Sequence, residues 1–470
     1  MFEAVIGIEI HCELKTTTKM FSGAPLLYGA APNTAINEID LAYPGTLPSV
    51  NKKAVEYGVT LAKALNCEID PVLRFDRKNY FYSDLAKGYQ ITQQYYPLGK
   101  NGTFEIMLDD DIYPVRINRL HLEEDTAKQF HTDKGSLIDF NRAGTPLVEV
   151  VTEADFRNGK QAAAYVDAFR LLVVHMGISD AVMAEGSLRC DVNISLRPKG
   201  QDEFGTKVEV KNLNSISNIE KAINYEIKRQ TEILENNEAV IMQTRRFDEA
   251  TETTVAMRSK DESVDYRYFR DANIPAIRIP EAIITATIPE RPVDRVNRYV
   301  NDYKLSVYDA KVLVQNKEMA EYFDAVTQNS TAYKLIVNWL TQDIASVIDQ
   351  KGDRDFAEWI KPDHFLELIE ALEKNIISSK QAKKVFAALL EGKSPKQFIK
   401  DENMVQISDE KTITDWIESI LKDNPQVVED YKNGLNKSMG FVVGQVMKLS
   451  KGQANPKITS QLVKTILDKQ

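Results

Sequence analysis

The sequence predicts a mixed α/β region, in which a sheet packs on helices, followed by an all-helical region. Residues 1 to about 290 contain many short segments in which apolar and polar side chains alternate, as they do in strands, with a few helical patterns between them. Prolines at positions 275, 280, 289 and 292 then interrupt the chain, and almost only helical patterns follow. A sheet covered by helices is the simplest way to bury the apolar side of the alternating segments.

The stretch at residues 4–14 (AVIGIEIHCEL) has the clearest strand pattern, because its residues alternate with a period of two. One side of this predicted strand is apolar, and the other side carries Glu9, His11 and Glu13. Two carboxylates beside an imidazole are groups that a hard divalent cation or a proton transfer would use. The alternative is an outer face that only contacts solvent.

Helical spacing of apolar residues predicts three helices in the first region, at residues 51–66, 159–176 and 214–236. The second of these ends at Gly177, a residue type that commonly follows a helix C-terminus. Alternating segments lie between the helices, which again favours a sheet packed on helices.

Explicit helix starts occur in the C-terminal region, at Ser378 with Gln381 three residues later and at Ser394 followed by Pro395. The pattern of predicted secondary structure changes near residue 292 and, less sharply, near residue 405, which suggests three domains. We expect them to cover residues 1–292, 293–405 and 406–470.

Length and composition exclude several classes of protein. A chain of 470 residues is too long for one core, and 43% hydrophobic with 27% charged residues is ordinary for a globular protein. We expect neither a transmembrane helix nor a signal peptide, because no apolar run is long enough and no basic segment precedes one. Three cysteines lie far apart without a CxxC pair, which excludes a zinc ribbon and fits a reducing cytoplasm.

Two further alternating stretches, residues 187–197 and 206–211, also place charged side chains on one side of a predicted strand. If these strands neighbour the first one, their polar faces merge into one patch. Carboxylates of such a patch would hold magnesium, and its cations would neutralise phosphate. The alternative is a solvated sheet face with cross-strand ion pairs. The residues of this patch are Glu9, His11, Arg189, Asp191, Lys207, Glu209 and Lys211.

Three other stretches could contribute to a site. The acids of RLHLEEDTAK (residues 119–128), including Glu124, suit a metal or the start of a helix. In RKNYFYSDLAKGYQ (residues 77–90), cations such as Lys78 and Lys87 alternate with aromatic rings, which suits a nucleotide base or an unpaired RNA end, or is simply an aromatic strand and turn. Glu249, in a polar hairpin, could also reach a metal.

Known nucleophile and phosphate-loop signatures are absent from the sequence. Gly392-Lys393-Ser394 resembles the end of a P-loop, but Ala387 stands where the earlier glycine is required. No GxSxG elbow and no Cys–His signature occurs, so the chain offers no hydrolytic nucleophile of its own.

The C-terminal 40 residues are basic, whereas the rest of the chain is acidic. Residues 431–470 hold seven lysines and one acid, a net charge of +6, which leaves −16 for the other 430 residues of a chain whose net charge is −10. A basic tail on an acidic body would attract nucleic acid. The alternative is an ordinary lysine-rich helical surface, and both interpretations stay open at this point.

These stretches together resemble, over essentially the full length, the family of B subunits of bacterial glutamyl/aspartyl-tRNA amidotransferases. The segments that carry the resemblance are VIGIEIHCELKTTTKMFS, DLAYPGTLP, RFDRKNYFYSD, LHLEEDTAK, DFNRAGTPLVEVV, EGSLRCDVNIS, VEVKNLNS, TRRFDEAT, DYRYFRD and MGFVVGQVMKLSKGQANP.

The resemblance implies an α+β fold with a glutamine-synthetase-like antiparallel cradle that binds ATP and Mg²⁺, then a helical domain and a small helical tail. It implies ATP-dependent phosphorylation of the side-chain carboxylate of Glu-tRNA(Gln) or Asp-tRNA(Asn), followed by amidation with ammonia. A separate amidase subunit would make that ammonia from glutamine, and a small third subunit would join the two. This division of labour is consistent with the missing hydrolytic nucleophile.

Roles for individual residues also follow from the resemblance. His11 and Glu124 are expected to bind magnesium, with Glu9, Asp191, Glu209 and Glu249 as further candidates. Arg189, Lys207 and Lys211 would lie near phosphate, and Lys78 and Lys87 would face the acceptor end or the ammonia exit. The lysines expected to hold the tRNA are Lys432, Lys437, Lys448, Lys451 and Lys457.

Two features that only some members of the family carry bear on the metal content and the type of this chain. Some relatives carry a zinc-binding CxxC set, which this chain lacks, so we expect no zinc. Archaeal relatives carry an inserted domain for which the run from Pro292 into helices leaves no room, which favours the bacterial type. Two alternatives stay open: a stand-alone ATP-dependent ligase acting on a small carboxylate, and a non-catalytic RNA-binding scaffold.

Overall fold

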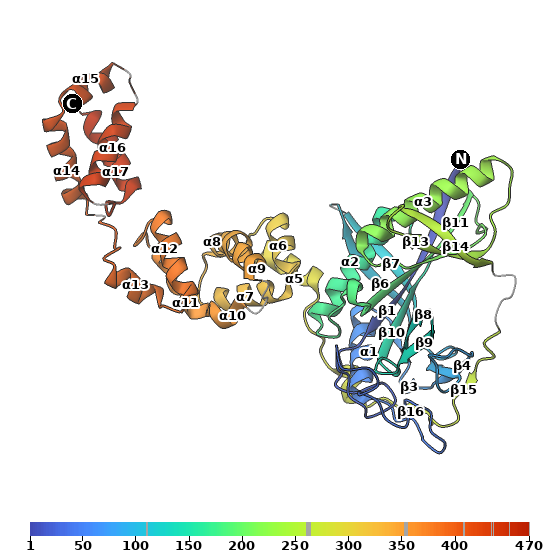
Figure 1. The fold of residues 1–470 in the computed structure, drawn as a ribbon. Helices are drawn as coiled ribbons and strands as arrows, with labels where there is room; N and C mark the ends of the chain where they lie inside the picture. Colours follow the sequence, from blue (N-terminus) through green and yellow to red (C-terminus); the bar gives the residue numbers. More distant parts are fainter. Residues whose placement is uncertain are drawn as a thin grey trace. The chain divides into compact units, whose positions relative to one another are not determined.

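The computed structural model describes residues 1–109, 111–259, 265–351, 356–407, 409–433, 435, 437–450 and 452–469. The chain forms two compact units, Met1–Arg295 and Val296–Gln470, coloured blue to yellow and yellow to red in Figure 1. The first unit is mixed α/β with a large sheet, and the second is helical, as the sequence predicts.

A nine-stranded sheet forms the centre of the first unit (Figure 1). Neighbouring strands are antiparallel except β12 and β13, which are parallel. In spatial order the strands are β14 (Thr253–Ser259), β13 (Gln243–Asp248), β12 (Val208–Lys211), β11 (Leu188–Pro198), β1 (Phe2–Glu13), β10 (Pro146–Thr152), β7 (Asp111–Glu124), β6 (Gly99–Leu108) and β2 (Glu68–Ile69).

One face of this sheet is apolar and buried under helices. The β1 residues Ile6, Ile8 and Ile10 are fully buried, and each contributes about 1.5–3 kcal/mol through burial. The covering helices are α1 (Lys52–Ala64), α2 (Gly159–His175) and α3 (Ile216–Glu235), which confirms the three predicted helices. Because strand side chains alternate between faces, the polar residues of β1 lie on the opposite, open face.

Smaller elements complete the first unit. A three-stranded sheet lies beside β7, and two further pairs of strands form separate ladders. These elements are β4 (Asp76–Asn79), β5 (Tyr89–Thr92), β15 (Phe269–Arg270), β3 (Val72–Leu73), β16 (Ile277–Arg278), the hairpin of β8 (Lys128–Thr132) and β9 (Gly135–Asp139), the 3₁₀ turn η1 (Met183–Glu185) and α4 (Glu281–Thr285).

The C-terminal region is built from helices that begin where the sequence gives start signals. Ser378 forms a reciprocal capping box with Gln381, and Ser394 caps the helix that has Pro395 at its first turn. The helices are α5 (Pro292–Asn301), α6 (Val307–Val314), α7 (Lys317–Thr327), α8 (Tyr333–Asn338), the π-helix η2 (Trp339–Ile344), α9 (Ala345–Lys351), α10 (Phe356–Trp359), α11 (Pro362–Glu373), α12 (Ser379–Leu390), α13 (Pro395–Asp401), α14 (Glu410–Asp423), α15 (Gln426–Lys432), α16 (Lys437–Leu449) and α17 (Pro456–Leu467).

Two separate apolar cores lie in this helical region. One joins buried residues between Val296 and Ile399, and the other joins buried residues between Ile413 and Leu467. The division of the whole chain into three domains stays a prediction that these cores support. Among the described residues, no helix combines the length and apolar character needed to cross a membrane.

Candidate functional site

A hollow of about 590 Å³ opens on the polar face of the main sheet. Side chains from β1, β7, β10, β11 and β12 line it, together with aromatic rings from the segments around β4 and β15. The structure thereby joins the polar sides of β1, β11 and β12 into one patch. Its charged and imidazole groups are Glu9, His11, Lys78, Arg119, His121, Glu123, Glu149, Asp191, Glu209 and Lys211.

Strand register brings two histidines and two glutamates together at the centre of this hollow. His11 lies opposite Glu149 across β1 and β10, and Glu149 lies opposite His121 across β10 and β7. The His11 Nδ1 atom is 3.1 Å from Glu123 Oε1, and the His121 Nε2 atom is 3.1 Å from Glu149 Oε2. The four groups therefore form one connected cluster.

The ionisation of this cluster follows from its contacts. Burial lowers the pKa of His11, but the hydrogen bond to Glu123 and the charges of Glu149 and Asp191 outweigh it and raise the pKa to about 8. Burial also lowers the pKa of His121, but the charges of Glu149 and Glu123 and the hydrogen bonds to them outweigh it and raise the pKa to about 9. The two histidines hold the pKa of Glu123 well below its usual range, although burial acts to raise it.

A second group of possible metal ligands adjoins the first through His11. Ligand atoms of Glu9, His11 and Asp191 lie within 4.8 Å of one another, as do those of His11, Glu123 and Glu149. Glu9 is oriented by Asn193, whose side-chain amide donates to Glu9 Oε1 at 2.7 Å.

The charge of the hollow suits a divalent cation. Among the residues that the structure describes, five carboxylates line it and Lys78, Arg119 and Lys211 carry permanent positive charge, which leaves two negative charges before the histidines are counted. Carboxylate oxygens supplemented by imidazole nitrogens are a donor set that can hold such an ion. The residues present therefore fit the cation that the sequence suggested.

Lys211, Glu209 and Asp191 form a polar group on the β12 side of the hollow. Lys211 is paired with Asp191, and its Nζ atom is 3.4 Å from Glu209 Oε1. The Thr244 hydroxyl donates to Glu209 Oε2 at 2.7 Å, which fixes that carboxylate from β13.

Three of the other predicted cations lie near the hollow with different surroundings. Lys78 lines the hollow with its Nζ atom 4.7 Å from the centre of the Tyr266 ring. Arg189 lines an adjoining cavity of about 660 Å³ and is bound to Asp125 at 2.7 Å. Lys207 is exposed just before β12 and lines a cavity of about 230 Å³ that also contacts Glu9.

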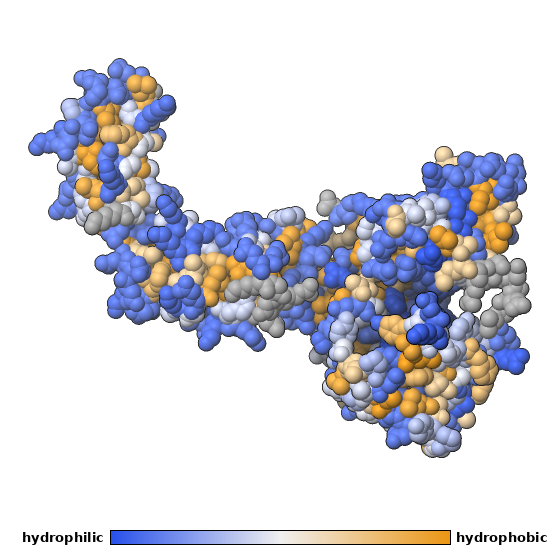
Figure 2. All heavy atoms as spheres, viewed as in Figure 1, coloured by the Kyte–Doolittle hydropathy of each residue, from blue (hydrophilic) through white to orange (hydrophobic). Residues whose placement is uncertain are grey.

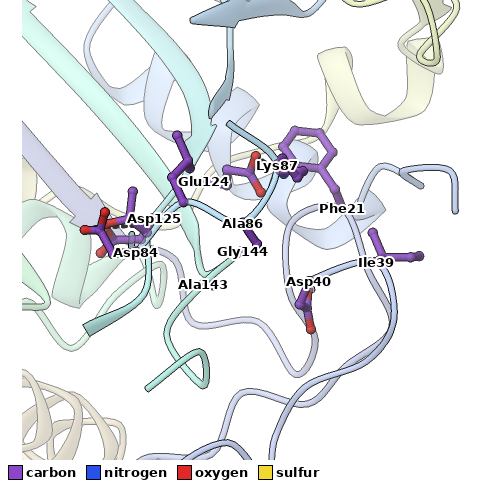
Figure 3. Close-up of a pocket in the computed structure, with 12 residues that line it drawn as sticks. Phe21, Ile39, Asp40, Asp84, Ala86, Lys87, Glu124, Asp125, Ala143 and Gly144 are labelled. Atoms are coloured by element: carbon purple, nitrogen blue, oxygen red, sulfur yellow. Dashed lines mark hydrogen bonds and ion pairs between the residues drawn. The ribbon is translucent and has the colours of Figure 1, made fainter. Parts of the chain in front are cut away.

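Glu124 does not line the hollow with His11, so the structure does not bring together the two residues that the resemblance pairs at a magnesium ion, and that pairing stays a prediction. Glu124 follows Leu120 and Leu122 on the apolar side of β7, whereas its neighbour Glu123 points into the hollow. The Glu124 carboxylate is paired with Lys87 and accepts a hydrogen bond from the Ile91 backbone at 3.0 Å. Figure 3 shows Glu124 and Lys87 beside one another in a separate, smaller pocket.

Glu249 also lies apart from the hollow. It is exposed after the end of β13 and accepts a hydrogen bond from the Asn218 amide at 2.7 Å, near the start of α3. A polar hairpin pattern does not reveal which face its tip approaches, so the expected metal contact of Glu249 stays a prediction that this position does not support.

Sequence reasoning did not select His121, Arg119 or Glu149. The polar side of β7 contains the first two at alternate positions, so the period of two could have found them. Glu149 stands in an almost entirely apolar central strand, PLVEVVT, and only its isolation as the one charge gives a signal.

The lysines of the tail lie on its surface. Lys432, Lys437, Lys448 and Lys457 are exposed, and no acid pairs with them in the part of the tail that the structure describes. Lys451 lies outside the described residues. In Figure 2, hydrophilic residues surround a strip of hydrophobic ones on the visible face of the tail.

Comparison with known proteins gives a consistent result across the chain. Residues 4–285 match the family model of the GatB/GatE catalytic domain, and residues 321–467 match that of the GatB domain. The B subunit of the aspartyl/glutamyl-tRNA(Asn/Gln) amidotransferase of Staphylococcus haemolyticus is 48% identical over 472 residues, covering 100% of this chain and 99% of the relative. The protein of the same name from Geobacillus thermodenitrificans is 49% identical over 469 residues, covering 98% of each chain.

Proposed function

The chain belongs to the family of aspartyl/glutamyl-tRNA(Asn/Gln) amidotransferase B subunits, and from this premise we propose that it converts a tRNA-bound acid into its amide. The substrates are Glu-tRNA(Gln), Asp-tRNA(Asn) or both, and the cosubstrate is ATP. The observation that carries the proposal is the hollow in which five carboxylates and two histidines converge beside cations.

The first unit would act as a glutamine-synthetase-like cradle. Its antiparallel sheet, with one face buried under helices and the other polar, supports this assignment. Residues 293–405 would form a helical domain and residues 406–470 a tRNA-binding tail. We place the protein in the cytoplasm, where charged tRNA is available.

The chemistry needs ATP because a carboxylate is a poor acyl donor. A carboxylate oxygen attacks the γ-phosphorus, the bond from that phosphorus to the β,γ-bridging oxygen breaks, and ADP leaves. Ammonia then attacks the acyl carbon, the acyl C–O bond breaks, and inorganic phosphate leaves as a proton is released from nitrogen. Such transfers depend mainly on positioning and charge neutralisation.

Mg²⁺ would be held by His11, Glu123 and Glu149, with Glu9 and Asp191 completing the set or holding a neighbouring ion. When bound, the ion neutralises phosphate oxygens and orients them. The proposed set contains Glu123 in place of Glu124, because Glu123 contacts His11, whereas Glu124 is paired with Lys87. The absence of a CxxC pair supports a site without zinc.

The cations around the hollow would serve the nucleotide and the acceptor end. Lys207 and Lys211 would face phosphate on the β12 side, and Glu209 would orient Lys211. Arg189 would face phosphate from β11. Lys78, beside the Tyr266 ring, would face the acceptor end, and Lys87 would face the route by which ammonia arrives.

The partners are an amidase A subunit, a small C subunit and the charged tRNA. An amidase is required because the sequence offers no glutamine-hydrolysing nucleophile. The exposed tail lysines Lys432, Lys437, Lys448 and Lys457, with Lys451, would contact the phosphates of the tRNA.

The test uses the assembled complex of this chain with its A and C subunits. With glutamine, ATP and Mg²⁺, it should amidate Glu-tRNA(Gln) or Asp-tRNA(Asn), and omission of ATP should stop the reaction. ATP turnover by the isolated chain with free glutamate, without tRNA, would instead indicate a stand-alone ligase. ATP-independent tRNA binding with no amidation would indicate an RNA-binding scaffold.

A further inference from the structure

Arg119 is a permanent positive charge in the hollow that has no acidic partner in the described part of the chain. It lies on the polar side of β7 and lines the hollow. Its Nε atom is buried, and no hydrogen-bond acceptor among the described residues reaches it. Lys211, in contrast, is paired with both Asp191 and Glu209.

Strand register explains why Arg119 has no acidic partner among the described residues. Its neighbour on β10 is Val151, and its neighbour on β6 is Lys100. An apolar side chain cannot pair with a guanidinium, and two like charges directly opposite one another destabilise a sheet. Glu9, on β1 opposite Val151, is the next residue across the sheet, so Val151 separates it from Arg119. The described part of the fold therefore leaves this guanidinium without a paired acid, at a cost in stability.

An unpaired guanidinium in a concave site is a receptor for an anion with two oxygens. Its planar N–H groups match a carboxylate or a phosphate in a two-pronged arrangement, which a lysine cannot provide. The hollow must admit both kinds of anion under the proposed function, so the position of Arg119 decides between them.

Position favours the carboxylate. The strand order β12-β11-β1-β10-β7 places Arg119 four strand spacings, about 19 Å at 4.7–4.9 Å each, from Lys211 on β12. Phosphoryl transfer aligns the attacking and leaving oxygens on opposite sides of the transferred group. If ADP leaves on the side of Lys207 and Lys211, the attacking carboxylate approaches from the side of β7.

We infer that Arg119 binds the side-chain carboxylate of the tRNA-linked Glu or Asp and thereby distinguishes substrate from product; this inference rests on the proposed function. The amide product offers one acceptor oxygen, but its NH₂ group would face the N–H donors of the guanidinium. That arrangement loses a hydrogen bond and opposes two donors. Conversion to the amide therefore weakens binding at Arg119 and favours product release.

The experiment measures equilibrium binding of Glu-tRNA(Gln) and of Gln-tRNA(Gln) to the assembled complex without ATP. The wild-type complex should bind Glu-tRNA(Gln) more tightly. Arg119→Gln should weaken binding of Glu-tRNA(Gln) by about 10- to 100-fold, the range for lost hydrogen bonds to charged groups, and leave Gln-tRNA(Gln) within twofold. Arg119→Lys should give an intermediate loss, because it keeps the charge but not the two-pronged geometry.

The control is Arg116→Gln on the same strand. Arg116 is exposed and paired with Asp155 outside the hollow, so this variant should bind both tRNAs as the wild type does. The KM for ATP should stay within twofold in all variants. The midpoint of urea denaturation should not fall in Arg119→Gln, because the substitution removes a positive charge from the position opposite Lys100 in the strand register.

Three results would overturn the inference: equal weakening of both tRNAs, a rise confined to the KM for ATP, or unchanged binding of Glu-tRNA(Gln). The first would indicate a structural role and the second a phosphate contact. Failure of the wild-type complex to amidate both Glu-tRNA(Gln) and Asp-tRNA(Asn) would instead overturn the proposed function.

Discussion

Glu123 and Glu124 offer a matched test of the cation site, because consecutive residues of β7 point to opposite faces of the sheet. The same substitution, Glu→Gln, preserves side-chain shape at each position and removes one negative charge. Glu123 contacts both histidines of the hollow, at 3.1 Å for His11 and 3.5 Å for His121. Glu124 is paired with Lys87 in the smaller pocket.

The expected magnitude follows from the charge of the hollow. Among the described residues, Glu123→Gln leaves four carboxylates against three permanent cations, so their summed charge changes from two negative to one negative. It also removes a direct candidate ligand. Loss of groups that only support a metal site weakens affinity by about 10- to 100-fold, so at least this loss is expected. A tenfold loss corresponds to about 1.4 kcal/mol. Glu124→Gln should change cation affinity less than twofold.

Bound Mn²⁺ can be counted by electron paramagnetic resonance as a probe for this site, in the assembled complex without nucleotide. Half-saturation should shift to higher Mn²⁺ concentration for Glu123→Gln alone. Urea denaturation serves as a control, because Glu124→Gln removes a buried charge partner and should lower stability without shifting the titration. The reverse pattern, with Glu124→Gln losing Mn²⁺ and Glu123→Gln keeping it, would refute the assignment of faces and the site built on it.

Four further outcomes are expected. With a chelator present, the free energy of unfolding should fall as the pH rises from 6.5 through about 8 and 9. In this range His11 and His121 lose the protons that their glutamate partners favour in the folded state, and urea denaturation at a series of pH values measures the effect. Deleting residues 406–470 should weaken tRNA binding and flatten its dependence on salt, while tRNA-independent glutaminase activity persists, as filter binding and a glutamate assay would show. Glu249→Ala should leave the Mn²⁺ titration unchanged, since this residue lies outside the hollow. Glu226→Ala should destabilise the first unit by about 3–5 kcal/mol in urea denaturation, because it leaves two arginines without their buried partner.

The period of two in β1, β11 and β12 was enough to predict which side of each strand is polar. Burial of alternate residues is strongly selected when one face packs on helices, so a shift by one residue would expose the core. Glu9, His11 and Asp191 could be assigned to one patch for this reason, and the structure places their ligand atoms within 4.8 Å of one another.

The remaining site residues depend on information that one strand does not contain. Glu149 belongs to a central strand whose other residues are almost all apolar, so its partners become visible only once β1 and β7 flank it. Glu123 and Glu124 are adjacent, so strand alternation places them on opposite faces of the sheet. The sequence can assign each to its face only if the strand is known to continue as far as Glu124. Glu249 follows a strand in a hairpin, where chain direction is set by packing rather than by local pattern.

The charged residues along the sheet make the two sides of the hollow different from one another. Cations flank the carboxylate-rich centre on two sides, with Lys211 on β12 and Arg119 on β7, and only Lys211 is paired with acids of the hollow among the residues that the structure describes. Above the raised pKa values of His11 and His121, the centre without a cation would repel both a triphosphate and a carboxylate, since like charges in a partly desolvated site interact strongly. Under the proposed function, a divalent ion held by these carboxylates and histidines would oppose this repulsion, and Lys211 and Arg119 would each attract one of the two anions from its own side of the hollow. The separation of Lys211 on β12 from Arg119 on β7 would therefore suit in-line transfer, with the nucleotide beside Lys211 and the attacking acid beside Arg119.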